Sequence, residues 1–219
     1  MLPPSVNFAP KYLSKVKSWH HNLHFAYDLI SELNPEIFVE LGTHLGDSYF
    51  TFCQSRKENN LVTNCFAVDH WMGDDHSGKY DEHVFETVNV YNTQKYPSFS
   101  FLKRKSFEQA LSDFDDYSIG LLHIDGHHAY ESIKNDFSVW FPKVKNNGII
   151  LIHDTLEREK GFGVYKFWDE IRLNYPSFNL NFSHGLGVLR KTNSKNLNWV
   201  ISPRFDYILK SKLYHKMKI

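Results

Sequence analysis

The stretch FVELGTHLGDSYF, residues Phe38–Phe50, decides the fold class. Its apolar run ends beside Glu40, and Gly42 and Gly46 follow. A buried strand that leads through a glycine-containing turn into a helix is typical of α/β proteins that hold a nucleotide at the carboxyl ends of their strands. The stretch therefore predicts a nucleotide-binding loop, and its details must show which nucleotide fits.

The same alternation of apolar strand and amphipathic helix continues along the chain. Strands alternating with helices predict βαβ units and a mostly parallel sheet. The expected strands are Ile37–Leu41, Cys65–Val68, Ser98–Leu102, Ile119–Ile124, Ile149–Ile152, Phe178–Phe182 and Leu186–Leu189. The expected helices are Ser18–Leu33 with Ser18 as N-cap, Asp47–Arg56, Asp81–Lys95, Ser106–Phe114, a segment with the stripe Ile133, Phe137, Trp140 and Phe141, and Val164–Tyr175.

The composition fits a single domain. The chain has 219 residues, which suffice for one domain with a sizeable core. Lys plus Arg and Asp plus Glu number 25 each, so no net charge draws the chain to nucleic acid or to an anionic membrane. The longest apolar runs have strand length, and Met1–Pro10 lacks the features of a signal peptide. We expect a cytoplasmic protein without a transmembrane segment, in which Cys53 and Cys65 are buried free thiols.

The loop after Glu40 does not fit a dinucleotide. A dinucleotide fingerprint places glycines where this chain has His44 and Asp47. A carboxylate at the start of the following helix would repel a phosphate. Asp69 ends the next strand, where its carboxylate can accept both hydroxyls of a ribose. The combination predicts a phosphate-free adenosine with a cationic sulfonium, S-adenosylmethionine.

Longer motifs carry a family resemblance over Trp19–Leu189. They are the opening stretch, FAVDHWMGDDHSGKY, GLLHIDGHHAYESIKNDFSVWFPKVKNNGIILIHDT, GFGVYKFWDEI and SHGLGVL, in this order. The sequence resembles class I S-adenosylmethionine-dependent methyltransferases of the glycosyltransferase-associated, methyltransferase domain 24-like family, which are related to sugar and catechol O-methyltransferases. The resemblance implies a Rossmann-like, doubly wound α/β fold with a mostly parallel seven-stranded sheet, an antiparallel last strand and helices on both faces. The methyltransferase domain is expected over residues 1–190. Residues 191–219, polar at first and then basic, are expected to form a basic C-terminal interaction tail, an appended helix or a linker cut from a longer chain.

The resemblance also implies which residues hold the cofactor. Asp69 would bind the ribose, His70 and Trp71 would flank the ring, and Asp125 would lie beside the cofactor. Ser106 would lie near the adenine, although a plain helix N-cap explains it equally well. The residues expected to cradle the methionine part are Glu40, Gly42, Thr43, Gly46 and Ser48.

Transfer of a methyl group to a sugar hydroxyl requires a base or a metal, because the hydroxyl is a weak acid. Related enzymes bind a divalent metal after the fourth and fifth strands, and Asp125, His153 and Asp154 match those positions. The imidazole of His153 replaces an oxygen ligand there and suits Mn, Fe, Co, Ni or Zn better than Mg. In the alternative, a metal-free site, His128 or His153 removes the proton.

Other histidines have less certain roles. His123 shares a strand face with Asp125 and is expected to be buried and hydrogen-bonded. His76 and His83 lie in or after a polar loop that could form a lid, and His184 could reach the same pocket. His20, His21 and His24 are expected in a solvated turn or, alternatively, in a helix that covers the cofactor and brings one of them to the substrate. Tyr130 and Trp140 are expected in packing, and Asp136 as a polar cap or a salt-bridge partner.

The leading hypothesis is an O-methyltransferase that acts on a sugar hydroxyl of a surface polysaccharide or a glycan precursor, with S-adenosylmethionine and with Mg or Mn as the metal that could assist. The expected partners are a small-molecule or glycan substrate, glycosyltransferases of the same pathway and a second copy of the chain in a homo-oligomer. Two alternatives are a metal-dependent hydrolase or hydroxylase on the same fold and a non-catalytic partner domain in a glycan-assembly complex.

Overall fold

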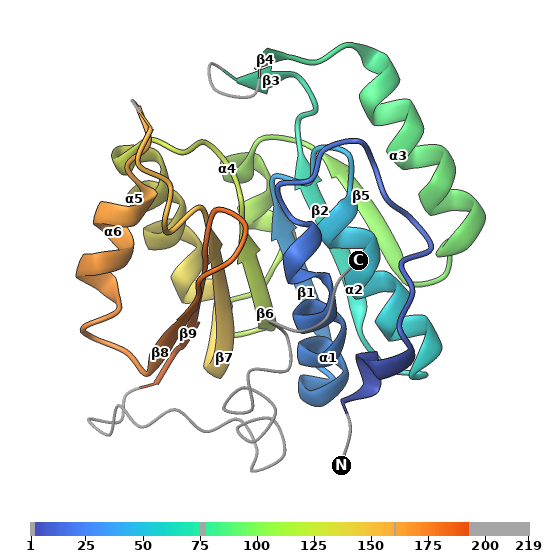
Figure 1. Ribbon diagram of the computed structural model, residues 1–219, viewed down its shortest axis with the longest axis horizontal. Helices are drawn as coiled ribbons and strands as arrows, with labels where there is room; N and C mark the ends of the chain where they lie inside the picture. Colours follow the sequence, from blue (N-terminus) through green and yellow to red (C-terminus); the bar gives the residue numbers. More distant parts are fainter. Residues whose placement is uncertain (1–2, 75–77, 160, 193–219) are drawn as a thin grey trace.

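The computed structural model describes residues 3–74, 78–159 and 161–192. Seven strands form one sheet in the order β5-β2-β1-β6-β7-β9-β8 (Figure 1). The first five of these strands run parallel, β9 is antiparallel to β7, and β8 is antiparallel to β9. The strands are β1 (Ile37–Leu41), β2 (Asn64–Asp69), β5 (Ser100–Arg104), β6 (Ile119–Ile124), β7 (Val144–His153), β8 (Ser177–Leu180) and β9 (Leu186–Arg190). The expected Rossmann-like, doubly wound sheet with an antiparallel last strand is confirmed.

Helices cover both faces of this sheet, as Figure 1 shows. Two buried clusters result, because successive side chains of a strand point to opposite faces. Phe38 of β1 packs in the cluster with α1 and α2, whereas Val39 packs in the cluster with α5 and α6. The helices are α1 (Leu23–Leu33), α2 (Asp47–Glu58), α3 (Glu82–Lys95), α4 (Phe107–Ala110), α5 (Tyr130–Trp140) and α6 (Val164–Ile171).

The same alternation places three polar side chains on one face of the sheet. Glu40 lies beside His123 in the β1–β6 register, and His153 ends β7 two residues after Leu151, which packs on the α1 and α2 side. These side chains face the α1 and α2 layer within the most buried part of the sheet. Strand alternation thus brings one glutamate and two histidines toward the same region.

The N-terminal segment differs from the expected helix Ser18–Leu33. The α-helix begins at Leu23, after a 3-10 turn over His20–Asn22, and Ser18 does not cap it. Trp19 continues the apolar spacing of the helix, but it is buried against the ends of the central strands instead. The periodicity prediction was therefore wrong for this part, because a long-range contact replaced the helical one.

Other boundaries moved by a few residues. The expected strand Ser98–Leu102 is Ser100–Arg104, and the expected helix Val164–Tyr175 ends at Ile171. Ser106 caps α4 in a capping box with Gln109, and a 3-10 turn over Leu111–Asp113 follows. The alternative prediction, that Ser106 is a helix N-cap, is thus confirmed.

The remaining described parts are small. A two-stranded sheet of β3 (Gly73–Asp74) and β4 (Gly78–Lys79) lies in the expected lid loop, whose His76 is outside the described residues. Lys191, the first residue of the expected tail, is buried and donates from Nζ to the carbonyls of Phe141 and Val144. Residues 193–219 are also outside the described part. None of the helices in the described ranges has the length and apolar character needed to cross a bilayer.

Candidate active site

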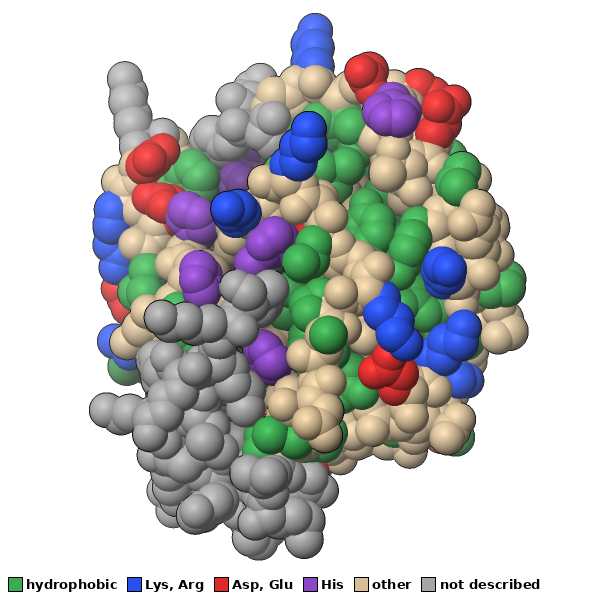
Figure 2. Space-filling model, turned by 45° about the vertical axis from the view of Figure 1, so that its right-hand side comes forward, with side chains coloured by type: hydrophobic (Ala, Val, Ile, Leu, Met, Phe, Trp, Pro, Cys, Tyr) green, Lys and Arg blue, Asp and Glu red, His purple; other side chains and the backbone are tan. Residues whose placement is uncertain are grey.

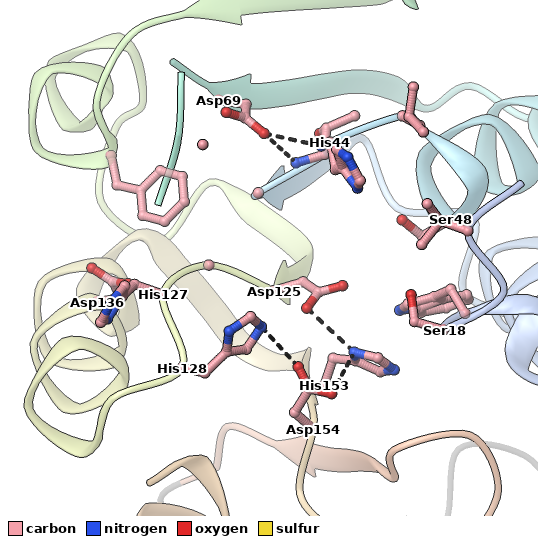
Figure 3. A pocket seen from close by; sticks show the side chains of 18 of the residues that line it. Ser18, His44, Ser48, Asp69, Asp125, His127, His128, Asp136, His153 and Asp154 are labelled. Atoms are coloured by element: carbon pink, nitrogen blue, oxygen red, sulfur yellow. Dashed lines mark hydrogen bonds and ion pairs between the residues drawn. The ribbon is translucent and has the colours of Figure 1, made fainter. Parts of the chain in front are cut away.

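A cavity of about 670 Å³ opens at the carboxyl ends of β1, β2, β6 and β7. Ligands of doubly wound sheets bind at this edge, where the strand order reverses. All cofactor, metal and catalytic residues expected from the sequence line the cavity except Glu40 and Trp71 (Figure 3). These lining residues are Gly42, Thr43, Gly46, Ser48, Asp69, His70, Ser106, Asp125, His128, His153 and Asp154.

The two glycines of the β1–α2 loop are required by the backbone. Gly42 has φ +84°, and a Cβ atom there would lie 2.1 Å from the carbonyl oxygen of Asp125. Gly46 has φ +88° and forms the N-cap of α2. Only glycine adopts such angles readily. The loop can therefore lie close against the end of β6 and expose its backbone to a ligand.

Asp69 holds this loop in place. Its Oδ2 accepts hydrogen bonds from the backbone N–H groups of Thr43 and His44, at 2.9 Å and 3.0 Å. Its Oδ1 accepts from the N–H of Trp71 at 2.6 Å. A carboxylate has about four acceptor positions, so the Asp69 side chain retains capacity for a ligand hydroxyl. The indole of Trp71 is buried and donates to the carbonyl of His44, and it does not line the cavity.

Glu40 forms a fully buried pair with His123 behind the cavity. Its Oε2 lies 2.9 Å from His123 Nδ1, and both side chains are 0% exposed. Burial raises the pKa of Glu40, although the hydrogen bond from His123 opposes the shift. The buried, hydrogen-bonded His123 agrees with the expectation. Glu40 is thus placed to support the strand ends from behind.

His153 lies between two carboxylates. Its Nδ1 is 3.3 Å from Asp125 Oδ1 and 3.3 Å from Asp154 Oδ1 (Figure 3). Burial alone would lower the pKa of His153, but the two carboxylates raise it well above its usual value. Burial likewise opposes ionisation of Asp125 and Asp154, yet the charge of His153 lowers the pKa of both. The three side chains therefore form an imidazolium bracketed by two carboxylates.

His128 contacts the other carboxylate oxygen of Asp154. Its Nε2 lies 3.0 Å from Asp154 Oδ2, and its ring stacks on Phe162 with a centroid distance of 4.6 Å. Asp154 has φ +60°, an uncommon angle for a non-glycine residue that often marks a functional site. Asp125, His128 and Asp154 place one potential ligand atom each within 4.8 Å of one another. The candidate metal ligands in the structure therefore include His128, whereas the sequence predicted His153.

The N-terminal segment forms a wall of the site, as the alternative of a segment that covers the cofactor allowed, although the lining residues precede the helix. Asp47, at the start of α2, accepts the backbone N–H of Ser14 at 2.7 Å and pairs with Nε2 of His20 at 3.0 Å. This contact folds the segment over the loop, so that Ser18 and Trp19 line the cavity. The expected solvated turn is therefore a partly buried part of the site. We refer to residues 3–22 as the N-terminal strap.

Two further predicted residues have other partners. His184 lines the cavity and pairs with Glu157 at 2.7 Å, as the sequence allowed. Asp136 is buried at the cavity wall, where burial raises its pKa to about 6. The N-cap of α5 is Ala129, so Asp136 is not the expected cap.

The comparisons with known proteins agree on the class. The model of a methyltransferase domain family matches residues 39–155, more than half of the chain, and the chain belongs to this family. The chain is similar to the SAH-bound methyltransferase PaMTH1 of Podospora anserina, with a TM-score of 0.59, 12% identity, and 84% of this chain and 81% of that chain covered. It is also similar to the O-methyltransferase TomG of Streptomyces achromogenes, solved with SAM, with a TM-score of 0.58, 10% identity and 86% and 96% covered. At these identities the two structures establish the fold alone.

The curated relatives are longer than this chain. The uncharacterized protein y4gI of Sinorhizobium fredii is 41% identical over 207 residues, which are 88% of this chain. The chain spans 23% of the length of y4gI and 61% of the length of a second curated relative.

Proposed function

We propose that the protein is an S-adenosylmethionine-dependent O-methyltransferase. One observation carries the proposal: Asp69, Asp125 and Asp154 line one cavity, and no Lys or Arg is found among its described lining residues. A phosphate-bearing nucleotide would meet carboxylates without a basic partner, whereas a sulfonium cation is favoured there. The membership in a methyltransferase domain family supports the same ligand.

The residues around the β1–α2 loop fit the two ends of this cofactor. Asp69 reaches the cavity with free acceptor capacity for a ribose. The methionine part would lie along Gly42, Thr43, Gly46 and Ser48, beside the start of α2. His70 and Ser106 line the same side of the cavity, toward the adenosine. Bound there, the cofactor supplies an electrophilic methyl group.

The acceptor hydroxyl must lose its proton as the new oxygen–carbon bond forms. We assign this proton to the pair of His128 and Asp154, whose Nε2 and Oδ2 atoms are 3.0 Å apart. Asp154 orients the imidazole and stabilises its positive charge, and His153 fixes Asp154 from the other side. Asp125 completes the group.

A divalent metal is the second candidate for activating the hydroxyl. Asp125, His128 and Asp154 offer two oxygen atoms and one nitrogen atom close together, a donor set that suits Mn, Fe, Co, Ni or Zn better than Mg. Turnover after treatment with EDTA, and after addition of MnCl₂ or MgCl₂, distinguishes the two candidates. Loss and recovery of activity supports the metal, and unchanged activity supports the base.

The function is tested by separating cofactor binding from turnover. We expect Asp154→Ala and His128→Ala to bind S-adenosylhomocysteine with nearly unchanged affinity in calorimetry and to lose turnover by 10²-fold or more, on the order expected for a lost proton acceptor. Full turnover in Asp154→Ala would contradict the assigned role. A protein that binds metal but not S-adenosylhomocysteine would instead support the hydrolase or hydroxylase reading.

We further propose that the acceptor is a sugar hydroxyl of a surface glycan or its precursor, and that the protein works in the cytoplasm beside glycosyltransferases. These assignments rest on the family resemblance of the HIDGHHAY motif, Asp125 included. Labelled methyl transfer to extracted glycan precursors would test them directly.

A further inference from the structure

One wall of the cavity lies beyond the residues assigned to the cofactor. It consists of Glu157, Glu159, Phe162 and His184, which we call the acceptor wall. The wall is well ordered by its own contacts. Glu157 Oε2 binds His184 Nδ1 at 2.7 Å, and Glu157 Oε1 accepts the backbone N–H groups of Arg158 and Glu159. The hydrogen bond from His184 lowers the pKa of Glu157, which is therefore ionised at neutral pH.

An aromatic ring stands beside these carboxylates. Phe162 stacks on His128, and the backbone N–H of Gly163 donates to the His128 carbonyl at 2.8 Å. The wall is thereby joined to the proton-accepting pair. An aromatic ring in a wall that also carries carboxylates is suited to a polyhydroxylated ring with a positive charge.

The charged residues of the cavity also favour a positively charged acceptor. A bound S-adenosylmethionine would add one net positive charge to a cavity whose described walls carry several carboxylates. Histidines gather on one side of the face shown in Figure 2; Lys and Arg side chains lie near them on the surface, but the described cavity walls contain neither. The carboxylates in those walls are Asp47, Asp69, Glu108, Asp125, Asp136, Asp154, Glu157 and Glu159.

Two residues that line the cavity carry buried donors. Nε2 of His153 and Nε1 of Trp19 have no hydrogen-bond partner among the described residues, and both side chains are only 3% exposed. Hydroxyl oxygens of a ligand would satisfy them.

We propose that the methyl acceptor is a phosphate-free amino sugar or a closely related amino polyol. Its ammonium group lies against Glu157 and Glu159, its ring lies on Phe162, and its oxygens accept from the two buried donors. This inference rests on the proposed methyltransferase function. It disfavours sugar phosphates and nucleotide sugars as acceptors, because the described walls of the cavity carry carboxylates and neither Lys nor Arg.

The test measures binding of matched ligands by calorimetry in the presence of saturating S-adenosylhomocysteine. The ligands are methyl glycosides of glucosamine, galactosamine and mannosamine, their neutral parent glycosides and their 6-phosphates. We expect at least one amino glycoside to bind tenfold or more tightly than its neutral parent, and its 6-phosphate to bind more weakly than the amino glycoside. The inference is wrong if no amine improves binding, or if a phosphate binds as tightly as the amine.

Variants locate the ammonium group. Glu157→Gln and Glu159→Gln should each reduce the preference for the amine about fivefold without changing the affinity for S-adenosylhomocysteine. Glu36→Gln, an exposed glutamate before β1 at the other end of the strands, is the matched control. Retention of the full preference in both variants overturns the placement.

The affinity for S-adenosylhomocysteine alone is measured first. If it is absent, the proposed function fails and the acceptor assignment fails with it. If it is present but the order of the glycosides is reversed, only the acceptor assignment is wrong.

Discussion

Asp69 connects two functions at the scale of a single residue, because its carboxylate both shapes the loop and faces the ligand. Three backbone N–H groups, those of Thr43, His44 and Trp71, lose their acceptor in Asp69→Ala. Since unpaired buried groups cost about 1–3 kcal/mol each and water will replace part of this loss, we expect a destabilisation of about 2–4 kcal/mol in urea unfolding. We also expect the affinity for S-adenosylhomocysteine to fall more than tenfold. The exposed Asp115→Ala is the control, and unchanged affinity in Asp69→Ala would contradict the role.

His153 makes the stability of the site depend on pH. Its pKa is raised in the folded state, so its contribution is complete below about pH 6.5 and is lost as the pH rises through the raised pKa. The pKa values of Asp125 and Asp154 are lowered, so their contribution is present above about pH 4 and is lost as the pH falls through the lowered values. We expect the difference in unfolding free energy between the wild type and His153→Gln to reach about 3 kcal/mol between these limits and to shrink on both sides.

Urea titrations at a series of pH values measure this difference, with the exposed His83→Gln as the control. A difference that does not vary with pH would show that His153 is neutral in the folded protein.

Asp136 should behave in the opposite way. Burial raises its pKa from 3.8 to about 6, so the ionised form opposes folding, and stability falls as the pH rises from about 4 through 6. We expect Asp136→Asn to stabilise the protein by about 1–3 kcal/mol at pH 8 and to have little effect at pH 4. Thermal and urea unfolding at the two pH values provide the measurement. A destabilisation at pH 8 would show that the carboxylate has a favourable partner when it is ionised.

At the scale of elements, the sequence pattern predicted the features that depend on residues close together in the chain. The apolar runs gave β1, β2, β6 and β7, and the strand-end acids placed the cavity at the correct edge. The spacing of Gly42 and Gly46 predicted a ligand loop because a positive φ demands glycine.

The sequence pattern could not predict contacts between residues that are far apart in the chain. Trp19 keeps the helical spacing of its neighbours, yet it packs on His123 and His153. The sequence offered no sign that Asp47 would bind the strap through Ser14 and His20. Nor could spacing decide which histidine joins Asp125 and Asp154 in the group that can bracket a metal, because that depends on how the loop after β6 turns.

The N-terminal strap gives a prediction at this scale. Asp47 binds Ser14 and His20 together, so Asp47→Asn weakens the charge-assisted part of both contacts. A loss of about 1.4 kcal/mol would raise the population of the open strap tenfold. We expect trypsin to cleave after the exposed Lys15 and Lys17 about tenfold faster in Asp47→Asn, as followed by mass spectrometry. Asp169→Asn, on the exposed side of α6, is the control, and equal cleavage rates would show that other contacts hold the strap.

At the scale of the whole molecule, the cavity joins parts that are distant in sequence. The strap, the β1–α2 loop, the end of β2 and the loops after β6 and β7 all contribute walls. A ligand that contacts all of them stabilises the folded chain as a unit, because it binds the folded state and not the unfolded one. The two buried clusters pack on the two faces of the sheet that carries these loops. Loss of packing on either face would therefore disrupt the site.

We therefore expect S-adenosylhomocysteine at about 100 times its dissociation constant to stabilise the protein by about 2.7 kcal/mol. For a domain of this size that corresponds to a rise in the thermal midpoint of roughly 5–10 °C in a single transition. ATP and NAD should give no comparable rise, because their phosphates would face Asp125 and Asp154 without a Lys or Arg among the described walls. Asp69→Ala should show a smaller shift at the same ligand concentration, and Asp115→Ala the full one. A larger shift with NAD than with S-adenosylhomocysteine would contradict the assignment of the cavity to a phosphate-free nucleoside.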